Sequence, residues 1–306
     1  MTTPVTYAAI ELDRNFAILY ILSTDGQILC DEFRSFPLEK STSFISITKQ
    51  ELIKEVLIEF VEVARLNKVP VWEIMGFSNQ NFSAAFEANR FIDDMNKELG
   101  LRLQKYTLLD EAIYLYRGLT YSLQYPKVPL GLCVLRDDKI HFIMEHEGEI
   151  VYQYSISIAP RLLWETTKDQ KNPITYISHI RSDILSALKS LQWPYRPRFL
   201  ICQGLDVSVL ASLMLQVPNI TTGQIHGSKI TRGNLRNKID HLLIHPNDAS
   251  LDNALYPNRT YTSLITAVFL EEIATYSMRD SIMISSGSLL LGRILSHMYT
   301  QAHLQN

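Results

Sequence analysis

The sequence contains little glycine and few cysteines. Only 12 of its 306 residues are glycine, about 4%, whereas soluble proteins average about 7%. The sequence therefore has few glycines with which to build loops that wrap phosphate groups. Three scattered cysteines, Cys30, Cys133 and Cys202, form no C-x-x-C pair. This excludes a disulfide framework and predicts a reducing, cytoplasmic location. No G-x-S-x-G sequence occurs, so an α/β-hydrolase nucleophile is unsupported.

The sequence also lacks an excess of charge and a long hydrophobic run. Its net charge is -3, so the chain has no excess of positive charge that would attract nucleic acid or an anionic membrane. The first five residues carry no basic region of a signal peptide, and the apolar run at 264–270 is far shorter than the roughly 20 residues of a membrane helix. We therefore expect neither a nucleic-acid nor a membrane partner.

What remains is an alternation of strands and helices. A β-branched and aliphatic run at 8–22 is interrupted by polar residues at 11–15, and Asp25-Gly26 predicts a turn before a second strand at 27–36. Thr48, with Glu51 three residues later, resembles the start of a helix, and a further helix at 82–99 is expected to stop at Gly100. Such alternation predicts an α/β fold.

The opening hairpin is followed by a second, similar one. A shift of 122 residues places Ile18 on Ile140 and Gly26 on Gly148, and the order of strand, polar interruption, strand and glycine turn repeats. Any two hairpins share some of this pattern, so chance is the alternative. A duplicated α/β domain predicts that the two polar interruptions face each other across a cleft. Prolines at 126 and 129 place the boundary between domains at 1–127 and 128–306.

Two further patterns have ordinary structural explanations. Gly287 and Gly292 have the spacing of a P-loop, but Arg293-Ile294 follows instead of Lys-Ser/Thr, so we interpret this as the start of a helix packed on a sheet. The basic run of Lys229, Arg232, Arg236 and Lys238 is typical of a solvated helix face, although clustered cations can bind a polyanion.

Several stretches, in collinear order along nearly the whole chain, resemble the exopolyphosphatase/guanosine pentaphosphate phosphatase (Ppx/GppA) family. Each matches one family motif, and together they comprise A-I-E-L-D-R-N at 9–15, D-E-A at 110–112, the hairpin turn at 148–150, I-H-G at 225–227 with I-T-R at 230–232, and I-S-S-G-S-L at 284–289. The resemblance implies two RNase H-like domains, as in actin, Hsp70 and sugar kinases, with the active site between them. It also implies that Glu111 corresponds to the catalytic carboxylate.

The sequence departs from the family where phosphate and metal should bind. The family's first loop, A-I-D-x-G-S-N, has Glu11 for its Asp, Asp13 for its Gly and Arg14 for its Ser, and only Asn15 matches. In the second loop, D-x-G-G-G-S, the Asp falls on Val134 and the glycines fall on Arg136, Asp137 and Asp138. A third glycine-rich turn keeps only Gly204, and the family's arginine falls near Asn81. Carboxylates in a loop that cradles a polyanion repel it.

Three functional hypotheses follow. The first is a Ppx/GppA-like protein that is weakly active or inactive and acts by binding, with polyphosphate, a guanosine nucleotide, a second copy of itself or an intact homologue as its partner. The second is a working exopolyphosphatase in which Arg14, Asn15, Arg136 and Gly204 hold phosphate. Glu11, Asp137 and Asp138 would then hold Mg²⁺, its only cofactor. The third is a kinase-like nucleotide binder of the same superfold.

Overall fold

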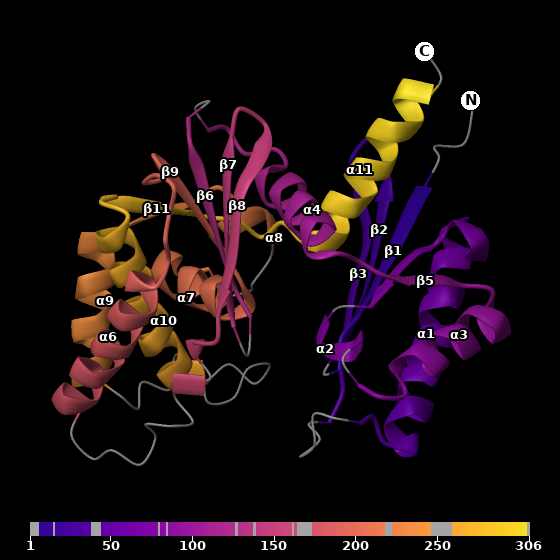
Figure 1. Ribbon diagram of the computed structural model, residues 1–306, viewed down its shortest axis with the longest axis horizontal. Helices are drawn as coiled ribbons and strands as arrows, with labels where there is room; N and C mark the ends of the chain where they lie inside the picture. Colours follow the sequence, from indigo (N-terminus) through magenta and orange to yellow (C-terminus); the bar gives the residue numbers. More distant parts are fainter. Residues whose placement is uncertain are drawn as a thin grey trace. The chain divides into compact units, whose positions relative to one another are not determined.

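In the computed structural model the chain divides into two compact units (Figure 1). The first comprises Met1–Gly118 and Ser288–Asn306, and the second comprises Leu119–Gly287. The structure describes the following residues: 6–14, 16–37, 44–78, 80–83, 85–125, 128–136, 139–160, 162–163, 173–217, 222–245 and 259–304. Within these ranges no helix is both long and apolar enough to cross a membrane.

The first unit is built on a five-stranded sheet in the order β3-β2-β1-β4-β5. Strands β1 to β3 form an antiparallel meander, whereas β1, β4 and β5 are parallel. The strands are β1 (Thr6–Leu12), β2 (Phe16–Ser23), β3 (Ile28–Ser35), β4 (Met75–Ser78) and β5 (Arg102–Lys105). The helical segments are α1 (Ile47–Leu66), the 3-10 turn η1 (Val71–Glu73), α2 (Gln80–Ser83), α3 (Ala88–Leu99), α4 (Leu108–Thr120) and α11 (Leu289–Leu304).

Side-chain alternation on β1 separates two faces of this sheet. Ala8, Ile10 and Leu12 point into the main core of the unit, where they join buried side chains of α1 and α3. Tyr7 points to the opposite face, where its ring meets His297 of α11 at 5.7 Å. Figure 1 shows α11, in yellow, beside the indigo β1 and β2.

The second unit repeats this plan on a six-stranded sheet in the order β10-β11-β9-β6-β7-β8. Strands β6, β7 and β8 form the antiparallel meander, and β6, β9 and β11 are parallel. The strands are β6 (Leu130–Leu135), β7 (Ile140–His146), β8 (Glu149–Ile156), β9 (Phe199–Gln203), β10 (Lys229–Thr231) and β11 (Ser281–Ile284). The helices are α6 (Pro173–Lys189), α7 (Leu205–Leu215), α8 (Thr222–Ile225), α9 (Arg232–Ile244) and α10 (Arg259–Tyr276).

The predicted pair of RNase H-like α/β domains is confirmed by these two sheets. Each has a three-stranded antiparallel meander joined to parallel strands, and β10 is an additional antiparallel edge strand of the second sheet. The glycines that suggested the duplication occupy the same turn of each meander. Gly26 and Gly148 have φ angles of 86° and 88°, a left-handed conformation that glycine adopts without strain.

The compact units divide the chain differently from the predicted split at residue 127. The last helix, α11, belongs to the first unit, where it packs on β1 and β2 and also approaches α4 with almost no space between the backbones. A Cβ on Gly292 would lie 1.7 Å from the carbonyl oxygen of Tyr114, and one on Gly118 would lie 1.9 Å from that of Ser288. Only glycine permits this approach, and it joins residues that are far apart in the sequence.

Local details differ at two helices of the first unit. Ser46, rather than Thr48, caps α1 by accepting a hydrogen bond from the Lys49 backbone N–H at 3.3 Å. The helix expected at 82–99 consists of the short α2 and the separate α3. The stop at Gly100 is confirmed, because Gly100 closes α3 with a φ of 70°.

Candidate functional site

In each unit, the predicted site residues that the structure describes lie at one edge of the sheet. In the first unit, β1, β4 and β5 are parallel, so the segments that follow them lie at the same, carboxyl edge. This is where open α/β sheets bind ligands. Residues 13–16 follow β1 and the start of α4 follows β5. We call the turn between β1 and β2 (residues 12–16) the first edge turn, and its counterpart between β6 and β7 (residues 135–140) the second edge turn.

In the first edge turn Asp13 and Arg14 are buried, and one donor of each is already used. Glu11 at the end of β1 is 2% exposed, Asp13 4% and Arg14 7%. The backbone N–H of Asp13 donates to the carbonyl of Phe16 at 2.9 Å. The Arg14 guanidinium donates through Nη2 to the carbonyl of Phe44 at 2.7 Å. The fourth predicted residue of this turn, Asn15, lies outside the described residues.

Glu111 is held at the same edge by a capping box. The Thr107 hydroxyl accepts from the Asp110 backbone N–H at 3.1 Å, and the Asp110 carboxylate accepts from the Thr107 backbone N–H at 3.1 Å. These reciprocal bonds fix the start of α4. They place Glu111, 5% exposed, in the first helical turn, where the helix dipole favours a negative charge.

The second unit brings Arg136 and Gly204 together. Strands β6 and β9 are parallel neighbours, so both residues lie just beyond their carboxyl ends. Gly204 precedes α7 with a φ of 147°, and a Cβ there would lie 2.5 Å from the Leu135 carbonyl oxygen. The backbone N–H of Arg136 donates to Lys139 O at 2.9 Å. Asp137 and Asp138 lie outside the described residues.

His141 is a functional candidate that the sequence analysis did not identify. It is 1% exposed, and its Nδ1 is hydrogen-bonded to the Ser155 hydroxyl at 2.8 Å. Burial, with the charges of Arg136 and Lys139, lowers the pKa of His141 from 6.5 to about 3. The imidazole is therefore neutral beside the second edge turn. Periodicity alone gives no signal for such a residue, since it occupies an ordinary strand position.

His226, within the family-like I-H-G stretch, is fixed by two backbone segments of the second unit. Its Nδ1 accepts from the Ser286 backbone N–H at 3.2 Å, and its Nε2 lies 2.9 Å from the Tyr121 carbonyl. Because Nδ1 accepts, the proton is on Nε2, which donates to Tyr121. The ring thus joins the segment after α4 to the segment after β11. This explains the presence of a histidine there without a catalytic role.

The described residues do not bring together three side chains suited to holding a metal ion. Carboxylate oxygens such as those of Glu11 are the ligands that Mg²⁺ prefers. The metal-binding roles of Glu11, Asp137 and Asp138, and the arrangement of the two edge turns across one cleft, stay predictions.

Comparison with solved structures gives consistent matches. A Ppx/GppA protein from Aquifex aeolicus has a TM-score of 0.86 at 18% identity, over 98% of this chain and 99% of that one. An exopolyphosphatase from Cytophaga hutchinsonii has a TM-score of 0.77 at 15% identity, over 97% and 98% of the two chains. The fold is that of the Ppx/GppA structures. No family profile and no curated protein matches the sequence. The Ppx/GppA fold thus covers both units, while the edge turns differ in sequence from the family pattern.

Proposed function

We propose that this chain is a member of the Ppx/GppA family whose phosphate-binding loops are eroded. In this proposal it hydrolyses phosphoanhydrides weakly or not at all and acts by binding in polyphosphate or guanosine pentaphosphate metabolism. Its partner would be the phosphate ligand, a second copy of the chain or an intact homologue. The observation that carries the proposal is the buried carboxylate of Asp13 in the first edge turn.

Asp13 stands where the family resemblance predicts glycine. A phosphate group at such a turn would meet a negative charge, and two like charges well beyond contact distance repel by on the order of 1 kcal/mol at an effective dielectric constant of 20. Glycine-rich turns bind phosphate because their backbone N–H groups approach the oxygens closely. Here the N–H groups of Asp13 and Arg136 donate within their own turns, so neither is available for a ligand.

The Arg14 side chain is poorly placed to bind phosphate in place of the glycine N–H groups that the family pattern predicts. Its guanidinium is largely buried and donates to the Phe44 carbonyl. To bind phosphate through Nη2, the guanidinium would have to give up this hydrogen bond. This argues against the role that the active-enzyme hypothesis assigns to Arg14.

The test measures equilibrium binding of long-chain polyphosphate and of guanosine pentaphosphate, each with Mg²⁺. We expect weak binding by the wild type and about fivefold tighter binding by Asp13→Asn, which corresponds to the roughly 1 kcal/mol of screened repulsion that is relieved. The control is Asp93→Asn, an exposed aspartate on α3, which should change affinity little. Tight wild-type binding that Asp13→Asn weakens would mean that Asp13 carries a metal ion, and would contradict the proposal.

One observation favours the alternative of an active exopolyphosphatase. Glu111 is retained, buried and fixed by a capping box at the carboxyl edge of the first sheet. A carboxylate in that position can act as a general base for water. In this alternative, carboxylates at the edge turns hold Mg²⁺, which would neutralise charge on the phosphates. A phosphate-release rate close to that of a family member with intact loops would support it.

A further inference from the structure

The second unit has a hollow of about 170 Å³ near the beginning of β9 and β11. Since β9 and β11 are parallel, this is the amino end of the strands, away from Arg136 and Gly204. Its lining combines cations, one carboxylate and apolar groups, namely Arg198, Phe199, Leu200, Lys229, Arg279, Asp280, Ser281, Ile282 and Met283. Three cationic side chains therefore surround one small concave surface.

Two of the three cations have no partner within the part of the chain that the structure describes. Neither the Arg198 guanidinium nor the Lys229 ammonium forms an ion pair or hydrogen bond there. Arg279 is oriented by backbone carbonyls, with Nε 3.3 Å from Ser277 O and Nη1 3.4 Å from Arg198 O. These bonds use two of its nitrogens and, among the described residues, leave Nη2 without a partner. A fixed guanidinium edge suits phosphate oxygens.

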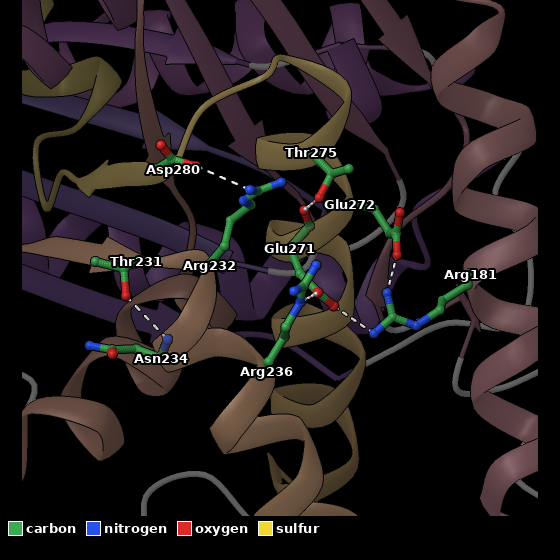
Figure 2. A network of polar contacts seen from close by, with 9 residues as sticks. All are labelled: Arg181, Thr231, Arg232, Asn234, Arg236, Glu271, Glu272, Thr275 and Asp280. Carbon is green, nitrogen blue, oxygen red and sulfur yellow. Dashed lines mark hydrogen bonds and ion pairs between the residues drawn. The ribbon is translucent and has the colours of Figure 1, made fainter.

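The single carboxylate of the hollow is engaged elsewhere. Figure 2 shows Asp280 directed toward Arg232, and the two are 3.1 Å apart. The next arginine of the basic run, Arg236, pairs with the buried Glu271. Among the basic residues at 229–236, Lys229 is therefore the one that contributes uncompensated charge to the hollow. The net effect is about three positive charges around a site large enough for linked phosphate groups.

We propose that this hollow binds a small oligophosphate, a ligand with two or three linked phosphate groups, through Arg198, Lys229 and Arg279. A diphosphate carries close to three negative charges near neutral pH and so matches the three cations. The apolar floor formed by Leu200 and Ile282 lowers the local dielectric constant and strengthens the attraction. This site uses a different edge of the sheet from the edge turns and does not depend on the function proposed above.

The test is titration of the full chain with inorganic pyrophosphate and tripolyphosphate at low ionic strength. We expect saturable binding that weakens as salt is added. Arg198→Gln and Lys229→Gln should each reduce pyrophosphate affinity by about fivefold or more, as expected for the loss of one charge-assisted contact of roughly 1 kcal/mol. Neither side chain has a partner in the described structure, so neither substitution should change thermal stability.

Two controls separate this site from other sources of binding. Lys189→Gln removes an exposed charge at the end of α6 in the same unit, and Arg136→Gln removes the cation at the second edge turn. Lys189→Gln should retain affinity within about twofold. Loss of binding in Arg136→Gln alone would place the ligand at the carboxyl edge and overturn the proposal. Equal losses in all four variants, equal affinity for citrate, or no saturable binding would overturn it as well.

Discussion

The two edge turns share one backbone hydrogen bond but differ in their side chains. In the first, Asp13 N donates to Phe16 O, and in the second, Arg136 N donates to Lys139 O, both at 2.9 Å. At the next-to-last residue of the strand before each edge turn, the polar side chain lies on a different strand of the pair in the two units. Glu11 pairs with Ile18 in the first unit, whereas Val134 pairs with His141 in the second. The first hairpin therefore has a carboxylate at this position, and the second has an apolar residue there.

The opposite turns of the same two meanders resemble each other more closely. Gly26 and Gly148 both keep a left-handed conformation. Other glycines remain where backbones touch, as at Gly204, Gly118 and Gly292. Glycine therefore occurs at these positions where the backbone requires it, and no glycine occurs in either edge turn.

The largest effect is expected at a glycine that the fold requires. Gly292→Ala places a Cβ 1.7 Å from Tyr114 O, so α11 and α4 must move apart, at a cost of about 3 kcal/mol or more in the free energy of unfolding. Gly148→Ala meets nothing within 4 Å and should cost only the roughly 1–2 kcal/mol of its left-handed backbone. Denaturant unfolding measures both. Similar values for the two variants would contradict the distinction.

The next effect concerns His141 beside the second edge turn. Its pKa falls from 6.5 to about 3 on folding, so below pH 6.5 the unfolded chain binds a proton that the folded chain does not. The free energy of unfolding should therefore fall by about 2 kcal/mol between pH 7 and pH 5. Unfolding curves of His141→Gln should lack this part of the pH dependence. His146→Gln, a substitution of an exposed histidine of the same strand, should keep it, and identical pH profiles for wild type and His141→Gln would show that folding does not lower the pKa of His141.

A smaller effect is expected at the acidic residues of the second edge turn. Asp137→Gly/Asp138→Gly removes two charges that oppose a polyanion, each worth on the order of 1 kcal/mol, so polyphosphate affinity should rise tenfold or more. Glu147→Gln/Glu149→Gln removes two charges at the opposite turn of the same meander and serves as the control. Weaker binding by the first variant, measured by the same titration, would indicate that these aspartates hold a metal ion.

Local features of the fold were predictable from the sequence, and contacts between distant residues were not. Gly26, Gly148 and Gly100 act within a few residues, so their turns and helix end could be read directly. The collinear order of the family-like motifs also identified Glu111 and the two edge turns as candidate site segments. The placement of α11 in the first unit depends on its contacts with β1 and β2 and on the close approach of Gly292 to Tyr114, and the engagement of Arg14 depends on Phe44. Neither contact can be recognised from the periodicity or the motif spacing of the sequence.

The central claim is that the edge turns have lost the capacity to hold phosphate for catalysis while Glu111 remains. Phosphoryl transfer depends mainly on positioning of the phosphate and neutralisation of its charge. A general base such as Glu111 therefore contributes little when no groups hold the phosphate in place. The most direct measurement is the rate of phosphate release from long-chain polyphosphate, with Mg²⁺, by the wild type and by Glu111→Gln. We predict a low rate in both, with intact folding. A measurable wild-type rate that falls a hundredfold or more in Glu111→Gln, within the range of general-base catalysis, would contradict the claim and identify Glu111 as the catalytic base.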